Sequence, residues 1–323
     1  MIAAVRAVLT GLRAVLLAPQ LLLVSALMML VVAVPFALLL GSRLQTSLAN
    51  QPPIAQSGIE IDPEWWAEFR QHARGLDATF TPTIIGFAAP LDNLSALADG
   101  TVRPWALAGP VALAAALWAW LWGGLIRRFA SRRAIGMRAF VAAGLRTTPA
   151  LLALSVISAG VTLLLYATVH RWLLGPVFGW LADLAGSERD AFFWRVALYA
   201  VFLALWSVLA LVIDYTRIAI VVSRARLREA LAGSWQFIRA HRGAVVGVYV
   251  LCGVMFAGLM AVYAGAELYS GTRLGGWRAI AMGQAFIFGR LAIRLTLAAS
   301  EVAVFQSAGG PAVDTAAVSE AAA

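Results

Sequence analysis

Lysine is missing from this sequence. All 25 basic residues are arginines, against 16 acidic residues, and charged residues make up only 13% of the chain. Soluble domains carry about 25% charged residues, so this scarcity of charge excludes an ordinary soluble domain. The arginine-only basic set, with abundant alanine, leucine, glycine and valine, is typical of a bacterium with a GC-rich genome.

Residues that carry common chemistry are also scarce. The single cysteine, Cys252, excludes an intrachain disulfide and a cysteine-based metal cluster. The sequence has no nucleophile-elbow serine motif, no phosphate-binding glycine loop and no His-Glu-x-x-His zinc motif. Its three histidines share no motif with one another: His72, His170 and His241. We therefore expect neither an enzyme nor a bound cofactor.

One segment does have a spacing that metal sites use. Glu64, Glu68 and His72 are four residues apart, which would place them on one face of a helix. Carboxylates and an imidazole arranged in this way can bind a divalent metal. Such a stripe is more often a solvated helix face, and no second ligand cluster accompanies it. We therefore predict no metal site.

Long apolar runs dominate what is present. Hydrophobic residues make up 62% of the chain, and the mean hydropathy is +0.83. The runs reach about 20 residues or more, the length that a helix needs to cross the hydrocarbon core of a membrane. We predict an all-α integral membrane bundle. Its six transmembrane helices are expected at residues 14–40, 105–126, 149–169, 192–213, 244–266 and 279–305.

The remaining segments complete one transmembrane domain over residues 1–307. An outer loop over residues 41–103 is too short for an independent domain of ordinary size. Within it we predict a helix at 62–76 and an amphipathic segment that caps the bundle at 82–100. Residues 308–323 are small and polar, and are expected to form a disordered cytoplasmic tail.

The arginines are distributed unevenly between the two sides of the predicted bundle. More than half of them fall on the side of the N-terminus, whereas most acidic residues fall on the opposite side. Arginine-rich loops stay in the cytoplasm, so both termini are expected in the cytoplasm, with the protein in a bacterial inner membrane. The net charge of +9 then reflects membrane topology and predicts no nucleic-acid partner.

Three segments that precede outward spans resemble one another. Residues 6–19 and 138–151 share Arg-Ala, Gly-Leu-Arg and a proline, and residues 228–241 keep the arginines around small residues. We interpret them as three repeats, each an interfacial helix followed by a transmembrane hairpin. The alternative is convergence among helices rich in alanine, leucine and arginine at the membrane interface.

Part of the chain also resembles known proteins. The segments Trp122-Gly123-Gly124-Leu125-Ile126, 214-DYTRIAIV-221 and 230-ALAGSWQFIRAHRGA-244 resemble a group of uncharacterised bacterial multi-span membrane proteins. The Ala-Leu…Ser-Trp…Arg…Arg pattern of the last segment, which precedes a span, also distantly resembles the membrane domain attached to some glycerophosphodiester phosphodiesterases. The resemblance implies a membrane fold and no activity, because the catalytic domain of those enzymes is absent from this chain.

The last predicted span carries charges that a membrane helix normally excludes. On a helix, Arg290, Arg294 and Glu301 fall on one narrow stripe, with Gly283 on the same face. An arginine at the centre of a bilayer costs about 2.5–3.5 kcal/mol or more, so the stripe should face protein or water. We expect its partners at the inner end of the fourth span, where Asp214 and Arg217 lie.

Two functions are compatible with this stripe. In the first, it lines a cavity that binds an anionic solute or a lipid headgroup, as in a permease-like or lipid-handling protein. In the second, it is a packing seam in a non-catalytic structural or assembly protein. A cavity that reaches the stripe favours the first function, and a dry seam of fully paired side chains favours the second. The expected partners are membrane lipids and one anionic ligand.

Overall fold

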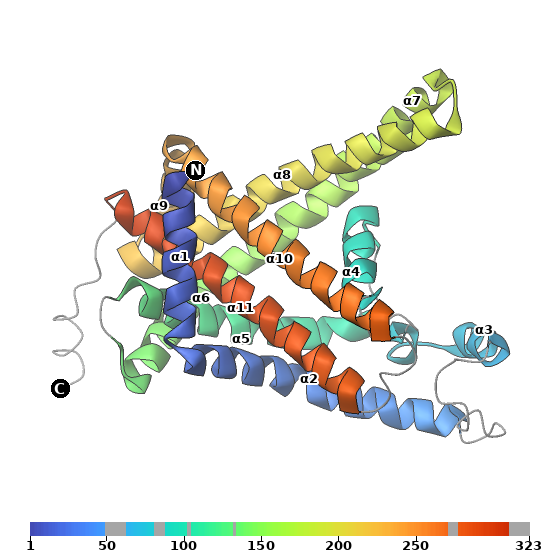
Figure 1. Ribbon diagram of the computed structural model, residues 1–323, viewed down its shortest axis with the longest axis horizontal. Coiled ribbons are helices and arrows are strands. Elements are labelled where there is room, and N and C mark those ends of the chain that lie inside the picture. Colours follow the sequence, from blue (N-terminus) through green and yellow to red (C-terminus); the bar gives the residue numbers. More distant parts are fainter. Residues whose placement is uncertain (49–62, 81–87, 102–104, 132–133, 271–276, 310–323) are drawn as a thin grey trace.

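The computed structural model describes residues 1–48, 63–80, 88–101, 105–131, 134–270 and 277–309 (Figure 1). Within these residues every regular element is a helix, which confirms the predicted all-α class. Apart from Ala308 and Gly309, the predicted disordered tail lies outside the described residues.

Five helical segments are long and apolar enough to cross a membrane, judged by length and composition. They are Pro19–Thr46, Trp105–Ala130, Met137–Leu184, Glu188–Val222 and Arg242–Tyr269. In the most apolar window of each segment, between 11% and 39% of the residues are buried inside the protein. Most of their surface is therefore free to face lipid, as expected of a multi-pass membrane protein.

The helices extend beyond the predicted apolar limits because they continue into polar flanking residues. The five segments correspond to α2 (Pro19–Leu48), α5 (Ala108–Ala130), α6 (Met137–Leu165), α8 (Glu188–Ser223) and α10 (Arg242–Ser270). After α6 the chain continues without a break through η5 (Tyr166–His170), η6 (Leu173–Val177) and α7 (Phe178–Leu184), where η5 and η6 are π-helical. The Ser187 side chain then caps the N-terminus of α8, where its hydroxyl accepts a hydrogen bond from the backbone N–H of Asp190.

The sixth predicted span corresponds to α11 (Trp277–Ser307). Its 31 residues give a length of about 46 Å, which exceeds the hydrocarbon thickness of a bilayer. It is not among the five segments named above, and it carries the charged stripe of Arg290, Arg294 and Glu301. Six spans therefore stay a prediction.

Two of the three predicted interfacial helices are separate elements. They are α1 (Ile2–Leu16), which ends just before α2, and α9 (Leu227–Ala240), which ends just before α10. The third is not separate, because α6 runs unbroken from Met137 through Pro149. Close packing against α5 keeps this part of α6 in line: a Cβ on Gly144 would lie 2.7 Å from the Trp120 carbonyl oxygen. The threefold repeat stays a prediction.

One face of the helix α1 packs against the rest of the protein. Its buried face consists of small residues, among them Ala4, Ala7 and Gly11. A Cβ on Gly11 would lie 2.7 Å from the Thr296 carbonyl oxygen of α11, so the two backbones are in close contact. On the other side of α1, Leu9 is 61% exposed and remains free to face the membrane interface.

Among its described residues, the outer loop holds two α-helices and the short 3-10 helix η2 (Asp77–Thr79). The first, α3 (Pro63–His72), confirms the helix predicted at 62–76, and the stacked rings of Trp65 and Phe69 lie 5.0 Å apart on it. The second, α4 (Ala88–Asp99), lies within the segment predicted to be amphipathic. Figure 1 shows α3 at the end of the molecule opposite the chain termini.

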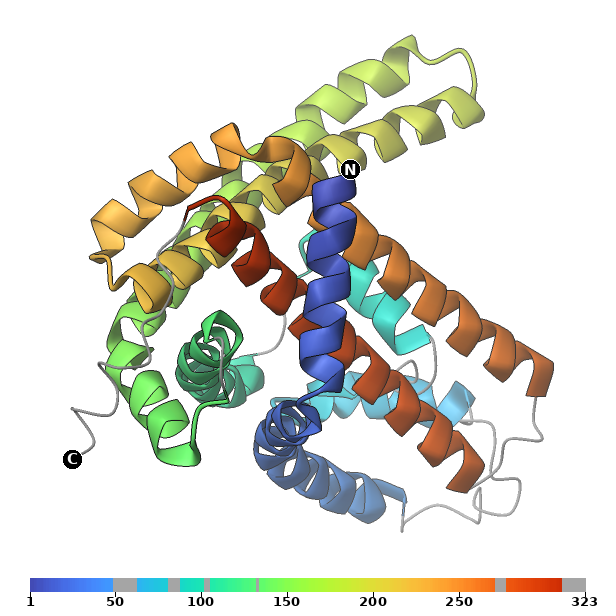
Figure 2. The same cartoon turned by 60° about the vertical axis from the view of Figure 1, so that its left-hand side comes forward.

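Two parts of the bundle differ in packing. The inner core is the large buried cluster contributed by α1, α2, α5, α6, α8, α9, α10 and α11. The outer arm, residues 166–202, is the far half of the hairpin that projects from the bundle in Figures 1 and 2. Its own buried cluster contains three residues: Leu173, Leu198 and Phe202.

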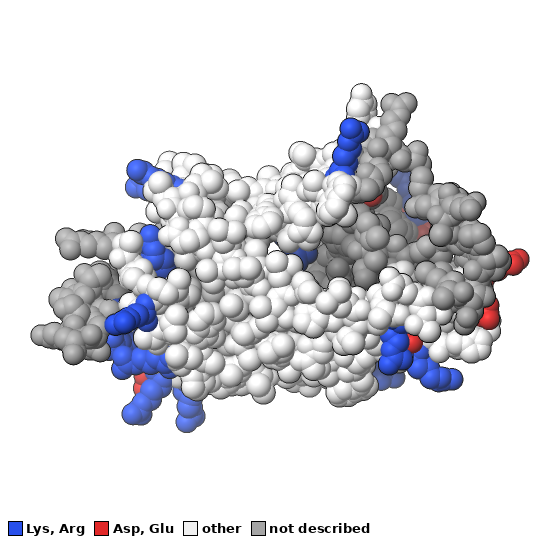
Figure 3. Space-filling model, turned by 90° about the horizontal axis from the view of Figure 1, so that it is seen from below, with Lys and Arg blue, Asp and Glu red and all other residues white. Residues whose placement is uncertain are grey.

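Charge gathers at the two ends of the molecule. Figure 3 shows a broad central belt with few charged atoms, with arginines clustered at the end where Figure 1 places both termini. Acidic atoms gather mostly at the opposite end of this view. A belt nearly free of charge between two charged rims is the surface expected of a protein that spans a bilayer.

Candidate functional site

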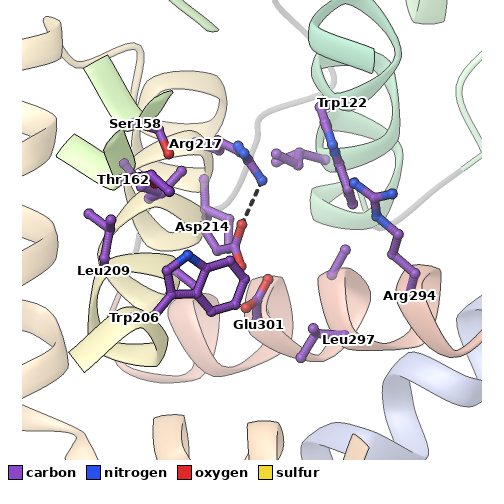
Figure 4. A pocket seen from close by; sticks show the side chains of 15 residues that line it. Trp122, Ser158, Thr162, Trp206, Leu209, Asp214, Arg217, Arg294, Leu297 and Glu301 are labelled. Carbon is purple, nitrogen blue, oxygen red and sulfur yellow. Dashed lines mark hydrogen bonds and ion pairs between the residues drawn. The ribbon is translucent and has the colours of Figure 1, made fainter. Parts of the chain in front are cut away.

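A cavity of about 250 Å³ lies between α5, α6, α8 and α11 (Figure 4). It carries four ionisable side chains: Asp214, Arg217, Arg294 and Glu301. The rest of its wall is apolar except for the two hydroxyls of Ser158 and Thr162 on α6. Pockets for drug-sized ligands measure about 300–1,000 Å³, so this cavity fits a small ligand or a headgroup.

Arg294 is the least neutralised charge in the cavity. Its guanidinium lies 4.3 Å from the ring centre of Trp118 and 5.5 Å from that of Trp122, which stabilises the cation over two aromatic faces. Among the described residues it makes no hydrogen bond and no ion pair, and its residue surface is exposed. Its N–H donors are therefore available to an anion.

Arg217 is held by an acid on its own helix. Its Nη1 donates a hydrogen bond of 2.6 Å to Oδ1 of Asp214, one helical turn earlier in α8. The Tyr249 hydroxyl of α10 donates to the other carboxylate oxygen of Asp214. The guanidinium also lies 5.9 Å from the ring centre of Trp122, so this indole lies between the two arginines.

Glu301 is the most deeply buried charged group of the cavity. It is 4% exposed, and among the described residues its Oε1 atom has no hydrogen-bond partner. Asp214 and Tyr249 both interact with its carboxyl group, from α8 and α10. A buried oxygen without a partner costs about 1–3 kcal/mol, which a ligand that bonds to it would recover.

The structure brings together four of the five predicted site residues. Arg294 and Glu301 of the stripe share the cavity with Asp214 and Arg217. Arg290, one turn before Arg294 on the same face, is exposed and does not line the cavity. This half of α11 packs against α10, where Leu259 lies beside Gly289.

Glycines bring the helices close enough to enclose this cavity. On α5, Gly123 and Gly124 lie against Thr147 and Phe140 of α6, and an added Cβ on Gly124 would lie 2.6 Å from the Phe140 ring. Gly123 and Gly124 therefore allow the close packing of α5 on α6.

The other residues considered for chemistry form no competing site. In the part of the chain that the structure describes, no group of three or more His, Cys, Asp or Glu side chains could hold a metal ion. The Nδ1 atom of His72 lies 2.9 Å from the Glu68 carbonyl oxygen of its own helix. His241 lies 3.1 Å from the Phe237 carbonyl oxygen in the same way, and Cys252 is buried.

The third histidine contributes to a polar contact on the outer arm. His170 Nε2 lies 2.6 Å from the Ala98 carbonyl oxygen, and the Tyr166 hydroxyl donates to the carbonyl of the preceding residue. The Tyr199 hydroxyl donates to Asp99 Oδ1 at 2.6 Å, which holds the pKa of that carboxyl below its usual value. These bonds attach the last turn of α4 to the arm, and we call them the arm clamp.

Sequence reasoning missed the two indoles beside Arg294, of which Trp122 lines the cavity. Trp118 and Trp122 are one helical turn apart on α5, a spacing that places both rings on one face. That signal was available, but it does not say which helix the indoles face. The same holds for Ser158 and Thr162, which are four residues apart on α6 and line the cavity.

Comparison with known protein families, with curated proteins and with solved structures finds no match to this chain. The resemblance to membrane domains of glycerophosphodiester phosphodiesterases therefore stays a prediction. The chemistry of the cavity is therefore the basis for inferring a function.

Proposed function

We propose that the protein binds a small anion or an anionic lipid headgroup in this cavity, as a permease-like or lipid-handling protein of a bacterial inner membrane. The observation that carries the proposal is Arg294, a cation without an acidic partner at a cavity inside an apolar bundle. Phosphate and carboxylate groups match the planar array of N–H donors on a guanidinium.

The membrane placement supports the same function. We infer that α11 is a sixth crossing, because its length suffices and its neighbours α10 and α5 are long apolar helices. The clustering of arginines at the end that holds both termini supports cytoplasmic termini. With this topology, the cavity lies within the membrane-embedded part of the bundle.

The alternative function, a structural packing seam, fits a different face of α11. Thr296 and Ser300 of α11 are fully buried, and Ser300 lies against Gly11 of α1. These residues pack backbone against backbone, which suits a structural role. Arg294 and Glu301 face a cavity instead, so the structural alternative accounts for the α1 side of the helix and not for its charges.

Binding of a phosphodiester anion tests this proposal. The full-length protein in detergent is titrated with dihexanoyl phosphatidylglycerol, and the affinity is measured by calorimetry. Arg294→Gln removes the charged donor and should weaken binding about 10- to 100-fold, since a hydrogen bond to a charged group contributes about 1.5–3 kcal/mol. Thermal unfolding of the variant verifies that it remains folded.

Arg290→Gln is the matched control. It removes the same charge from the same helix, one turn away and outside the cavity, and should leave the affinity within about twofold. Equal losses in both variants would show that only the overall positive charge attracts the lipid. No measurable binding by the unmodified protein would contradict the proposal.

A further inference from the structure

The charges that line the cavity balance one another. Arg217 is paired with Asp214, and the remaining two ionisable groups are one cation, Arg294, and one acid, Glu301. With all four groups ionised, the cavity has no net charge. An added monoanion would bring a net negative charge into the interior of an apolar bundle, which is costly at low dielectric.

Glu301 determines how this cost is avoided. Its Oε1 atom is buried, has no hydrogen-bond partner among the described residues, and belongs to a side chain that lines the cavity. As a carboxylate it would repel an anion bound to Arg294. As a carboxylic acid it would instead donate a hydrogen bond to that anion and leave the cavity electrically neutral.

We propose that the cavity binds a phosphodiester or similar monoanion together with one proton, which Glu301 accepts. This inference rests on the proposed function and adds a coupling ion to it. In the balanced step, the free protein with ionised Glu301 takes up one anion and one proton, and the complex carries the same charge as before. A transporter with this site would move the anion electroneutrally with a proton.

Other groups around Glu301 do not replace it in this role. Those that face it or share its cavity come from three helices: Asp214, Tyr215 and Arg217 on α8, Tyr249 and Cys252 on α10, and Arg294 on α11. Asp214 already accepts hydrogen bonds from Arg217 and Tyr249 on its two oxygens, so its carboxylate form is satisfied.

The remaining helices around α11 add no acid to the cavity. On α9 (Leu227–Ala240), which contacts α11 through Phe237 and Phe305, the charged residues lie outside the cavity lining: Arg228, Glu229 and Arg239. The described helices α1, α2, α5 and α6 carry only arginines as ionisable side chains, and none of these lines the cavity. They are Arg6, Arg13, Arg43, Arg127, Arg128, Arg138 and Arg146. Glu301 is therefore the cavity's acid that has an oxygen free to bind an anion through a proton.

The test measures anion affinity against pH. A phosphodiester keeps one negative charge between pH 5 and pH 9, so a change in its affinity reports on the protein. Dihexanoyl phosphatidylglycerol is titrated into the full-length protein across this range. Uptake of one proton with each anion makes the affinity fall up to about tenfold for each pH unit of increase. Calorimetry in buffers with different ionisation enthalpies counts the proton directly.

Glu301→Gln keeps the shape of the side chain and fixes it in a neutral, hydrogen-bond-donating form. This variant should bind the anion at high pH with the affinity that the unmodified protein reaches only at low pH, and it should lose the pH dependence. A pH dependence that persists in this variant would assign the proton to another group and overturn the inference.

The two proposals fail in different ways. Binding by the unmodified protein with no proton uptake overturns the coupling and leaves the anion site standing, whereas no binding at any pH overturns both. If Glu301→Gln does not fold, the proton count on the unmodified protein still decides the coupling. A second probe, the deacylated headgroup glycerophosphoglycerol, separates the two ligand sources. Equal affinity indicates a free solute, and binding of the acylated probe alone indicates a lipid.

Discussion

The inner core and the outer arm are built from the same kinds of residues but are held together differently. In the inner core, helices from distant parts of the chain cross at glycines, and α1 meets α11 backbone to backbone at Gly11. In the arm, two helices share three buried side chains, and large residues such as Trp172 and Trp180 are more than half exposed.

This difference explains where the protein can keep charge. Burying an arginine or a glutamate requires surrounding helices that supply partners from several directions. Around the cavity these come from α5, α8 and α10, which provide an indole, a guanidinium and a phenol. The arm offers only one partner helix on each side and is suited to contact with lipid, apart from its clamp on α4.

Gly11→Leu should have the largest effect, because it breaks the inner core where two backbones touch. The new side chain would meet the Thr296 carbonyl oxygen, which cannot rotate away. Overpacking of this kind costs about 3 kcal/mol, so the melting temperature of the protein in detergent should fall by several degrees.

Gly179→Leu is the matched control in the arm. No atom lies within 4 Å of a Cβ at this exposed position of α7. The melting temperature should therefore stay nearly unchanged. Equal destabilisation by the two variants would contradict the contrast in packing between the core and the arm.

Asp214→Ala should have the next largest effect. It leaves Arg217 without its acid and Tyr249 without its acceptor in a partly buried site. Losing the partner of a buried polar group costs about 2 kcal/mol, which denaturation in detergent can measure. Asp214→Asn keeps an acceptor oxygen and should recover part of the loss. If both variants were as stable as the unmodified protein, the pair would have no structural role.

Gly100→Ala should release the arm clamp with a smaller, local effect. Gly100 has a φ of +65°, and an added Cβ would lie 2.9 Å from the Tyr166 ring. Hydrogen exchange in α4 should increase, while the melting temperature changes little. Gly75→Ala is the control, since that residue has a φ of +58° and no neighbour within 4 Å. Both substitutions lower the free energy of unfolding by about 1–2 kcal/mol, because alanine disfavours the left-handed backbone. Only the additional effect of the substitution at Gly100 therefore reports on the clamp.

Acidification should weaken the same clamp, with the smallest effect. The Tyr199 hydroxyl lowers the pKa of Asp99 below its usual value of 3.8. A lowered pKa in the folded state stabilises the clamp above the usual pKa, and this contribution is lost as the pH falls through the folded value. Hydrogen exchange of α4 should therefore increase below about pH 4. Tyr199→Phe should remove this pH dependence, and an unchanged profile in that variant would exclude Asp99 as its source.

Much of the fold could be predicted because it depends on local patterns. Run length predicted the helical class and five helices that are long and apolar enough to cross a membrane, and α3 lies within the helix predicted at 62–76. The helical phase placed Arg294 and Glu301 on one face, as the cavity requires. These features follow from periodicity, which a single sequence contains.

Features that depend on which helices are neighbours could not be predicted. The phase of α11 puts Arg290 on the same stripe, but only Arg294 and Glu301 of the stripe line the cavity. In the same way, the predicted repeat placed a separate interfacial helix before the third span, whereas α6 runs unbroken through Pro149 with Gly144 packed on α5. Tertiary contacts decided both outcomes.

The central claim is that the charged stripe lines a cavity that water and anions can enter. Cysteine accessibility tests it most directly. In a Cys252→Ala background, Thr162→Cys places a thiol on the cavity wall, and Ser25→Cys places one in α2 at a fully buried position outside it. A negatively charged methanethiosulfonate reagent is added with and without dihexanoyl phosphatidylglycerol. We predict that the thiol at position 162 reacts, is protected by the phosphodiester, and that the thiol at position 25 does not react. Equal inertness of both thiols would contradict the claim and indicate a dry seam.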